Sequence, residues 1–171
     1  IDKGFGGDAR SDGGTSQRVL ANVLTWMAEK TSPVFLVATA NGVEKLPPEL
    51  IRKGRFDEIF LLDLPTKEER FSILQLHIHQ RRPNIDIPLQ TVVDRTQGFS
   101  GAELEQTVIE AMHFAFAERR ELQESDLILA SAQLVPLSRT AKEQISSLKE
   151  WASTGRARPA SVGLSKLMGN N

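Results

Sequence analysis

The 171-residue sequence contains no cysteine, and this absence excludes several kinds of site at once. Disulfide bonds, thiol nucleophiles and zinc or iron–sulfur centres that depend on cysteine thiolates are all ruled out. Long apolar runs are missing too, because no stretch approaches the ~18 consecutive apolar residues that a membrane-spanning helix needs. The sequence also does not begin with a basic segment followed by an apolar one, so it predicts a soluble protein in a reducing compartment.

A surplus of either charge is lacking as well. The sequence has 21 lysines and arginines against 22 aspartates and glutamates, which gives a formal net charge of −1. Nucleic-acid binding depends on a positive field, so we expect no nucleic-acid partner. The length suits one domain or slightly more, and the 40% hydrophobic and 25% charged residues are typical of a globular protein.

A helix pattern follows the glycine-rich start of the chain. In residues 15–30, Val19, Val23 and Trp26 recur at helical spacing, and a second apolar stripe lies beside them. The two stripes together predict one helix with a broad apolar face.

Two apolar runs predict strands in the first third of the chain. Residues 34–38 are all apolar and lie between Pro33 and Asn41, and residues 58–65 contain a second such run. Runs of this kind are typical of strands that are covered on both faces in a parallel α/β sheet.

The rest of the sequence has helical signals. Thr66 with Glu69, and Ser100 with Glu103, have the spacing of capping boxes, which begin helices. Apolar spacing after them predicts buried faces with Phe71, Leu74 and Ile78 in the first helix and Leu104, Val108, Ala111 and Ala115 in the second. Further helices are predicted near residues 125–134 and 140–151.

These patterns divide the chain into three parts. The predicted boundaries are an α/β part over residues 1–64, an all-α part over residues 65–151 and a tail over residues 152–171. The tail has basic and small residues but no acidic one, so we predict that it is mobile or is ordered only against a partner.

Two motifs have better explanations than the sites they suggest. The stretch GFGGDA at residues 4–9 matches a dinucleotide-binding fingerprint, which requires a helix directly after it. RSDGG follows instead, and this favours a surface loop. His77 and His79 point to different faces of a helix, and His113 is remote in sequence, so no metal site is predicted.

Asn41 stands where a ligand could bind, at the carboxyl end of the first predicted strand. An amide at this place can both donate and accept a hydrogen bond. A hairpin turn at Asn41-Gly42 is the alternative, although Pro47-Pro48 stands where the returning strand would be. This motif alone leaves both interpretations open.

Arg52 and Arg55 flank Gly54, which permits a sharp turn just before the second predicted strand. Guanidinium groups suit phosphate because their fork of N–H donors matches phosphate oxygens. The alternative is a solvated charged turn in which Arg55 pairs with Asp57 or Glu58.

The order of these features resembles the second half of an AAA-type ATPase module, over about residues 1–135. The motifs that carry the resemblance are the strand ending in Asn41, the proline-rich connector, RKGRFD, the second strand, the capped helix and GFSGAEL. The resemblance implies the remnant of a P-loop NTPase parallel sheet followed by an all-α lid. It also implies that Ile1 directly follows the acidic Walker B pair and that residues 4–14 form a pore-facing loop. Within the family, residues 25–60 resemble AAA-like proteins encoded by cyanobacteria and algal plastids.

The resemblance assigns a role to five residues. Asn41 resembles the residue that holds the attacking water near the γ-phosphate of ATP. Arg55 resembles the main arginine finger and Arg52 its companion, both acting on ATP held by the neighbouring subunit. Gly101 and Ala102 resemble the start of the lid helix near the adenine and ribose, where other ring ATPases often place a further arginine.

The chain also departs from the family pattern. Lys53 replaces the proline of the common RPGR, which loosens the turn, and the sequence contains neither a G-x-x-x-x-G-K-[ST] motif nor the acidic pair. We therefore expect these 171 residues alone neither to bind ATP tightly nor to hydrolyse it. The resemblance implies a parent protein that uses ATP and Mg²⁺ in a homo-oligomeric ring, such as a hexamer, to remodel a protein partner in the cytoplasm or plastid stroma.

Three alternatives stay open at this point. The chain is a non-catalytic interaction module derived from an AAA lid, or it belongs to a membrane-bound ATP-dependent zinc protease, whose H-E-x-x-H motif is absent here. The third is nucleic-acid binding through Arg52, Lys53, Arg55 and the tail, which the net charge of −1 disfavours.

Overall fold

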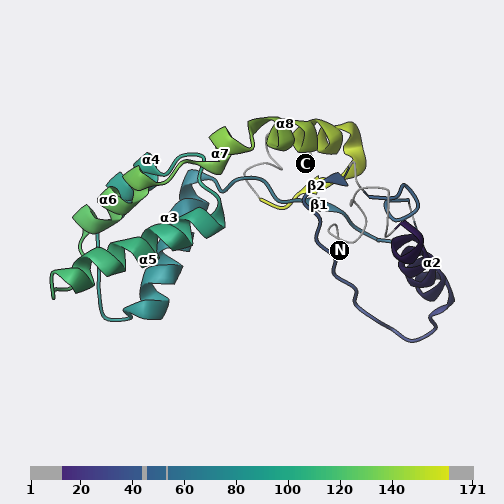
Figure 1. The fold of residues 1–171 in the computed structure, drawn as a ribbon, viewed down its shortest axis with the longest axis horizontal. Helices are drawn as coiled ribbons and strands as arrows, with labels where there is room; N and C mark the ends of the chain where they lie inside the picture. Colours follow the sequence, from purple (N-terminus) through teal and green to yellow (C-terminus); the bar gives the residue numbers. More distant parts are fainter. Residues whose placement is uncertain (1–12, 44–45, 53, 162–171) are drawn as a thin grey trace. The chain divides into compact units, whose positions relative to one another are not determined.

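A computed structural model describes residues 13–43, 46–52 and 54–161 (Figure 1). The chain divides into two compact units: residues 1–60 with 150–158, and residues 61–149 with 159–171. The buried core lies in the second unit, which contains helices α3 to α7. Its helices are α3 (Lys67–Arg81), α4 (Gln90–Arg95), α5 (Gly101–Ala117), α6 (Glu124–Gln133) and α7 (Leu137–Thr140), and most of α8 (Lys142–Trp151) also belongs to it.

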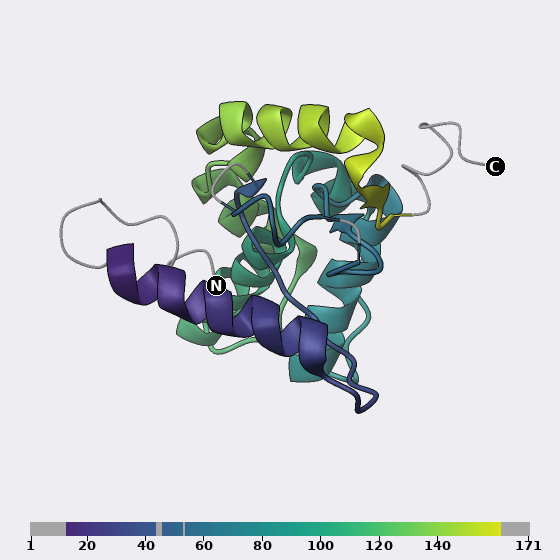
Figure 2. The same ribbon diagram turned by 90° about the vertical axis from the view of Figure 1, so that its right-hand side faces the viewer.

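Helix α2 (Gly13–Glu29) lies in the first unit and confirms the helix predicted for this stretch (Figure 2). Its predicted apolar face is less covered than the sequence suggests, because Val19, Val23 and Trp26 are 50%, 39% and 43% exposed. The predicted glycine-rich loop lies almost wholly outside the described residues, and α2 already includes the last two of its glycines.

The strand predicted over residues 34–38 is wrong. This stretch forms no strand, and Phe35 and Val37 are 94% and 70% exposed. A strand covered on both faces needs a hydrogen-bonded strand beside it. Across the part of the chain that the structure describes, the one sheet contains only β1 (Phe60–Leu61) and β2 (Arg158–Pro159).

The second predicted strand exists but is shorter than residues 58–65. β1 covers only Phe60 and Leu61, and Phe60 is 59% exposed while Leu61 is buried. β2 pairs with it in parallel, since the Arg158 N–H donates to the Ile59 carbonyl at 2.8 Å and the Ala160 N–H donates to the Leu61 carbonyl at 2.9 Å.

The beginning of the predicted mobile tail also differs from the prediction. Helix α8 (Lys142–Trp151) continues into the π-helical turn η2 (Ala152–Arg156), and β2 follows. The backbone pairing of β2 with residues near β1 explains the order of this segment, and no composition-based argument reveals such a partner. Residues 162–171 lie outside the described residues.

Both predicted capping boxes of the second unit are confirmed. The Glu69 N–H donates to Thr66 Oγ1 at 3.3 Å and the Thr66 N–H donates to Glu69 Oε2 at 2.8 Å. The corresponding distances for Ser100 and Glu103 are 3.3 and 2.6 Å. Each box satisfies N–H groups that a helix start leaves unpaired, so α3 and α5 begin where the sequence predicts.

The core of the second unit forms where α5 contacts α3 and α6, and α4 contacts α3 and α6 (Figure 1). Its fully buried side chains include Leu74, Leu104, Val108 and Leu127. The predicted buried face of α5 is confirmed. The prediction that Phe71 of α3 is buried is wrong, because this residue is 40% exposed. The short helices α4 and α7 have no counterpart among the helices predicted from the sequence pattern.

Candidate functional site

The two predicted arginine fingers belong to one turn of the first unit. The Arg55 N–H donates to the Arg52 carbonyl at 3.3 Å, and Gly54 between them has φ +90°. This positive φ favours glycine, because residues with a Cβ adopt it only with local backbone strain. The local sequence therefore determines the turn, and it places Arg52 and Arg55 on the same short segment.

The two arginines differ in burial and in hydrogen bonding. Arg55 is partly buried and its Nη1 donates to the Leu24 carbonyl of α2 at 3.1 Å. Arg52 is exposed. A guanidinium has five N–H donors, so this bond orients Arg55 and leaves further donors for a ligand.

Asn41 is exposed and lies directly before the buried Gly42. The structure does not place it at the end of a strand, because the apolar run before it is an exposed segment. The hairpin alternative also finds no support, since no strand pairs with this stretch within the described ranges.

Gly101 and Ala102 are the first two residues of α5, in the second unit. The Ser100–Glu103 capping box fixes the start of this helix. A Cβ at Gly101 would meet no atom within 4 Å, and Ala102 is exposed, so no described residue of this unit crowds the helix start.

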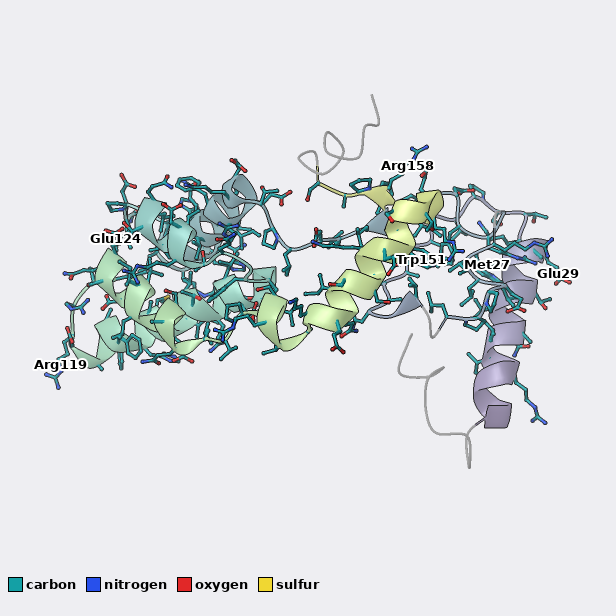
Figure 3. The ribbon with its side chains drawn as sticks, turned by 90° about the horizontal axis from the view of Figure 1, so that it is seen from above. Met27, Glu29, Arg119, Glu124, Trp151 and Arg158 are labelled. Carbon is teal, nitrogen blue, oxygen red and sulfur yellow. The ribbon has the colours of Figure 1, made fainter. Side chains whose placement is uncertain are left out.

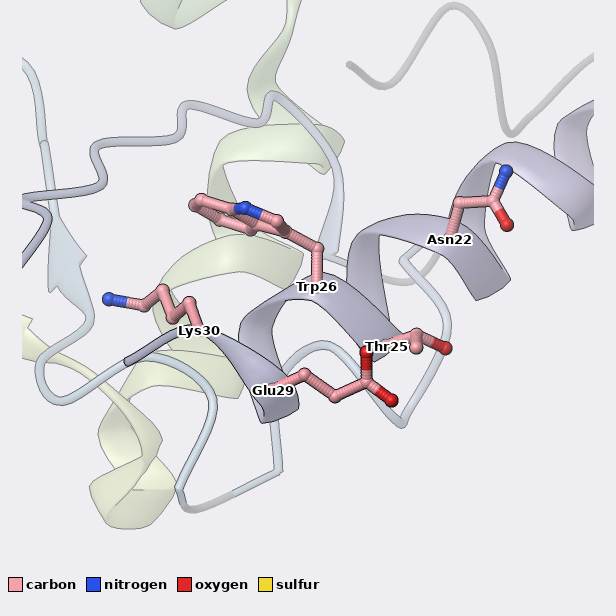
Figure 4. Close-up of a pocket in the computed structure, with 5 residues that line it drawn as sticks. All are labelled: Asn22, Thr25, Trp26, Glu29 and Lys30. Carbon is pink, nitrogen blue, oxygen red and sulfur yellow. The ribbon is translucent and has the colours of Figure 1, made fainter. Parts of the chain in front are cut away.

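A groove of about 370 Å³ on α2 did not emerge from the sequence (Figure 4). Its lining residues are Asn22, Thr25, Trp26, Glu29 and Lys30. The Lys30 ammonium lies 5.8 Å from the centre of the Trp26 ring, a cation–π distance, and Lys30 Nζ also donates to the Val34 carbonyl at 3.3 Å. Helical spacing placed Trp26 on an apolar face, and only its 43% exposure in the structure reveals the groove.

Two of the histidines, His77 and His113, lie within 4 Å of a carboxylate in the second unit. His77 Nδ1 is 3.5 Å from Glu105 Oε1, and Arg81 Nη2 donates to the same oxygen at 2.7 Å. The hydrogen bond from Arg81 lowers the pKa of Glu105 below its ordinary value. Among the described residues, no group of three His, Asp or Glu side chains could hold a metal ion.

Comparison with known families identifies the class. Residues 1–64 match the ATPase family associated with various cellular activities (AAA), and residues 86–130 match the AAA+ lid domain. The chain therefore belongs to the AAA ATPases and contains sequence of the ATPase domain followed by its lid. The helical second unit and the small parallel sheet are consistent with the remnant of a P-loop NTPase followed by a helical lid.

Comparison with individual proteins shows which members of the family this chain is similar to. The chain is 50% identical over 167 residues to an uncharacterized AAA domain-containing protein ycf46 of Pyropia yezoensis. The aligned residues are 95% of this chain and 34% of that protein. A ycf46 protein of Trieres chinensis is 51% identical over 164 residues, 94% of this chain and 33% of that protein. An ATP-dependent zinc metalloprotease FtsH of Mesomycoplasma conjunctivae is 37% identical over 93 residues, 54% of this chain and 12% of the protease. The chain thus spans about a third of the length of the ycf46 relatives.

The structure also bears on the question of a membrane segment. None of the helices in the described part of the chain combines the length and the apolar character needed to cross a bilayer.

Proposed function

We propose that this chain supplies part of an ATP-hydrolysing site that two neighbouring subunits of an AAA ring share. The observation that carries the proposal is the turn from Arg52 to Arg55, which presents two guanidinium groups directly before β1. This turn lies within the AAA match over residues 1–64, and the lid match over residues 86–130 supports the same assignment.

The chemistry of phosphoryl transfer suits these residues. Negative charge spreads over the γ-phosphate oxygens in the transition state, and Arg55 stabilises that charge from the neighbouring subunit with Arg52 beside it. An arginine finger contributes ~10³–10⁵ to the rate in related reactions. Asn41 orients the attacking water through its amide, and Gly101 and Ala102 lie beside the nucleotide base.

ATP and Mg²⁺ are held mainly by residues outside this chain. The printed sequence lacks the glycine-rich phosphate-binding motif with its lysine, and the described residues contain no three-ligand acidic or histidine group. We therefore assign no magnesium ligand to these residues. The 171 residues alone are expected to show no ATP turnover.

The parent protein assembles as a homo-oligomeric ring, with a hexamer as the expected size, and uses ATP to remodel a protein substrate. It works in the cytoplasm or, in an alga, in the plastid stroma. An arginine finger that acts in trans needs a neighbouring subunit, and a ring gives every nucleotide site such a neighbour.

Mixed rings of the full-length protein test the proposal. One variant carries Arg55→Ala, and the other carries alanine at the lysine of the phosphate-binding loop. Each alone is expected to lose ATP hydrolysis by at least ~10³-fold. Mixing them restores activity, because subunits with an intact loop then meet neighbours with an intact Arg55.

An exposed arginine of the lid, Arg95, provides the control, since Arg95→Ala should leave hydrolysis unchanged. Mixtures that stay inactive would contradict the action of Arg55 between subunits. If Arg55→Ala has no effect on the full-length protein, the chain is instead a non-catalytic interaction module.

A further inference from the structure

A pocket of about 360 Å³ lies at the turn between α5 and α6 in the second unit. Met112, Ala115 and Leu122 contribute apolar side chains to its lining, and the last two are buried. The pocket is separate from Gly101 and Ala102, which stand at the other end of α5. Neither the ATPase chemistry nor the family matches account for it.

The rim of the pocket exposes one large aromatic side chain. Phe116 is 82% exposed, the most exposed large apolar residue of this unit in the described ranges. Exposing a phenylalanine beside an apolar pocket is unfavourable in water, and such side chains are frequent anchors in protein interfaces.

The charges on the rim are unequally paired. The Arg120 guanidinium is well paired, because it donates to Asp126 at 2.6 and 2.7 Å and to Glu118 at 2.6 Å. The ion pair between Arg82 and Glu121 is long, with Nε 3.7 Å from Oε2, and both side chains are more than half exposed. Arg119 points into solvent (Figure 3), and its guanidinium has no partner within the part of the chain that the structure describes. The rim therefore offers at least one unsatisfied positive charge.

The backbone at Arg119 adds an independent observation. Its φ is +54°, the left-handed conformation that usually belongs to glycine just after a helix C-cap. Two backbone bonds hold the turn: the Arg119 N–H donates to the Phe116 carbonyl at 3.0 Å, and the Arg120 N–H donates to the Ala115 carbonyl at 3.1 Å. Arginine is unfavourable at this position, so stability alone does not explain why it is there.

We propose that this pocket binds a short peptide segment of a protein partner in which an apolar side chain neighbours a carboxylate. The apolar side chain enters the space beside Met112 and Leu122 and packs against Phe116. The carboxylate forms an ion pair with Arg119, and Arg82 is available to a second carboxylate once it exchanges its long contact with Glu121. Because both the apolar lining and the unpaired guanidinium are used, an acidic peptide fits better than a basic or a purely apolar one.

Selection from a phage-displayed library of random short peptides on the full 171-residue chain tests the proposal. We expect enriched sequences that place an aromatic or branched aliphatic residue next to aspartate or glutamate. A fluorescein-labelled copy of the most enriched peptide then reports the dissociation constant by anisotropy. Increasing salt should weaken its binding, because the ion pair to Arg119 is solvent-exposed.

Three variants separate binding from folding. Phe116→Ala, Arg119→Glu and Arg119→Gly should each raise the dissociation constant about tenfold or more. Arg119→Gly removes the charge but also relieves the backbone, so its thermal midpoint should equal or exceed that of the wild type while its binding is lost. Arg139→Glu makes the same charge change at an exposed position of α7 and should bind like the wild type.

Several results would overturn the proposal. These are the absence of enrichment over the Phe116→Ala chain, enrichment of basic peptides, and wild-type binding by Arg119→Gly. A change in oligomeric state with Arg119→Glu in the absence of peptide would assign the surface to a second copy of the chain, and it would equally overturn binding to a separate partner.

Discussion

Arg120 forms a bidentate ion pair with Asp126: Nη1 donates to Oδ2 at 2.6 Å and Nη2 donates to Oδ1 at 2.7 Å. The same carboxylate accepts the Gln123 N–H at 2.9 Å and so closes the start of α6. One buried carboxylate thus joins the end of α5 to the beginning of the next helix. This arrangement holds the turn on which Phe116 and Arg119 are exposed.

Asp126 should make the free energy of unfolding of the chain depend on pH. The hydrogen bonds from Arg120 lower the pKa of Asp126 below its ordinary value of 3.8. A carboxylate with a lowered folded pKa contributes stability that is complete above the unfolded pKa and disappears as the pH falls through the folded pKa. Asp126→Asn should therefore reduce the free energy of unfolding by a constant amount from about pH 7 to pH 5, and by less below about pH 4.

Urea unfolding followed by circular dichroism across this pH range measures the difference. Asp86→Asn is the matched control, because Asp86 is exposed and has no hydrogen bond or ion pair among the described residues. A deficit of Asp126→Asn that stays the same at low pH would contradict the ionic role of Asp126.

The capping serines and threonines should matter more than those within helices. Ser100→Ala and Thr66→Ala each remove a side chain that accepts a backbone N–H, so each should cost about 1 kcal/mol of unfolding free energy. Ser72→Ala, on the exposed surface of α3, should change it by less than about 0.5 kcal/mol. Equal effects of all three would show that the caps do not stabilise these helices.

Two glycines of the second unit should respond in opposite ways to alanine. Gly98 has φ +81°, and a Cβ there would clash with the Ser138 side chain, so Gly98→Ala should cost about 1–3 kcal/mol. Gly101 faces open space inside the first turn of α5, and Gly101→Ala should stabilise the chain by about 0.4–1 kcal/mol. Thermal and urea unfolding of the two variants measures the contrast, and a stable Gly98→Ala would contradict the clash.

Gly54 links backbone geometry to the proposed catalysis. Gly54→Ala strains the positive φ of the turn but meets no neighbouring atom, so the expected loss of stability is only about 1 kcal/mol. The displaced arginines should nevertheless lower the kcat for ATP of the full-length protein about 10–100-fold, since small misplacements of catalytic groups are costly. Steady-state hydrolysis assays measure this effect. Wild-type kcat would contradict a role for the turn in catalysis.

Short-range patterns determined much of this protein. The capping boxes at Thr66 and Ser100 act within four residues, and the buried face of α5 follows from helical spacing alone. The turn from Arg52 to Arg55 is equally local, because Gly54 supplies its positive φ. Such features could be predicted because their partners stand next to them in the chain.

Features that depend on distant partners required the tertiary structure. An apolar run becomes a buried strand only beside another strand, and residues 34–38 have none within the described ranges. The pairing of β2 with β1, the exposure of Trp26 and Phe116, and the unpaired charge of Arg119 likewise depend on which residues the fold brings together. Burial and charge pairing are properties of neighbours in space, and one-dimensional spacing records them only where those neighbours are also close in sequence.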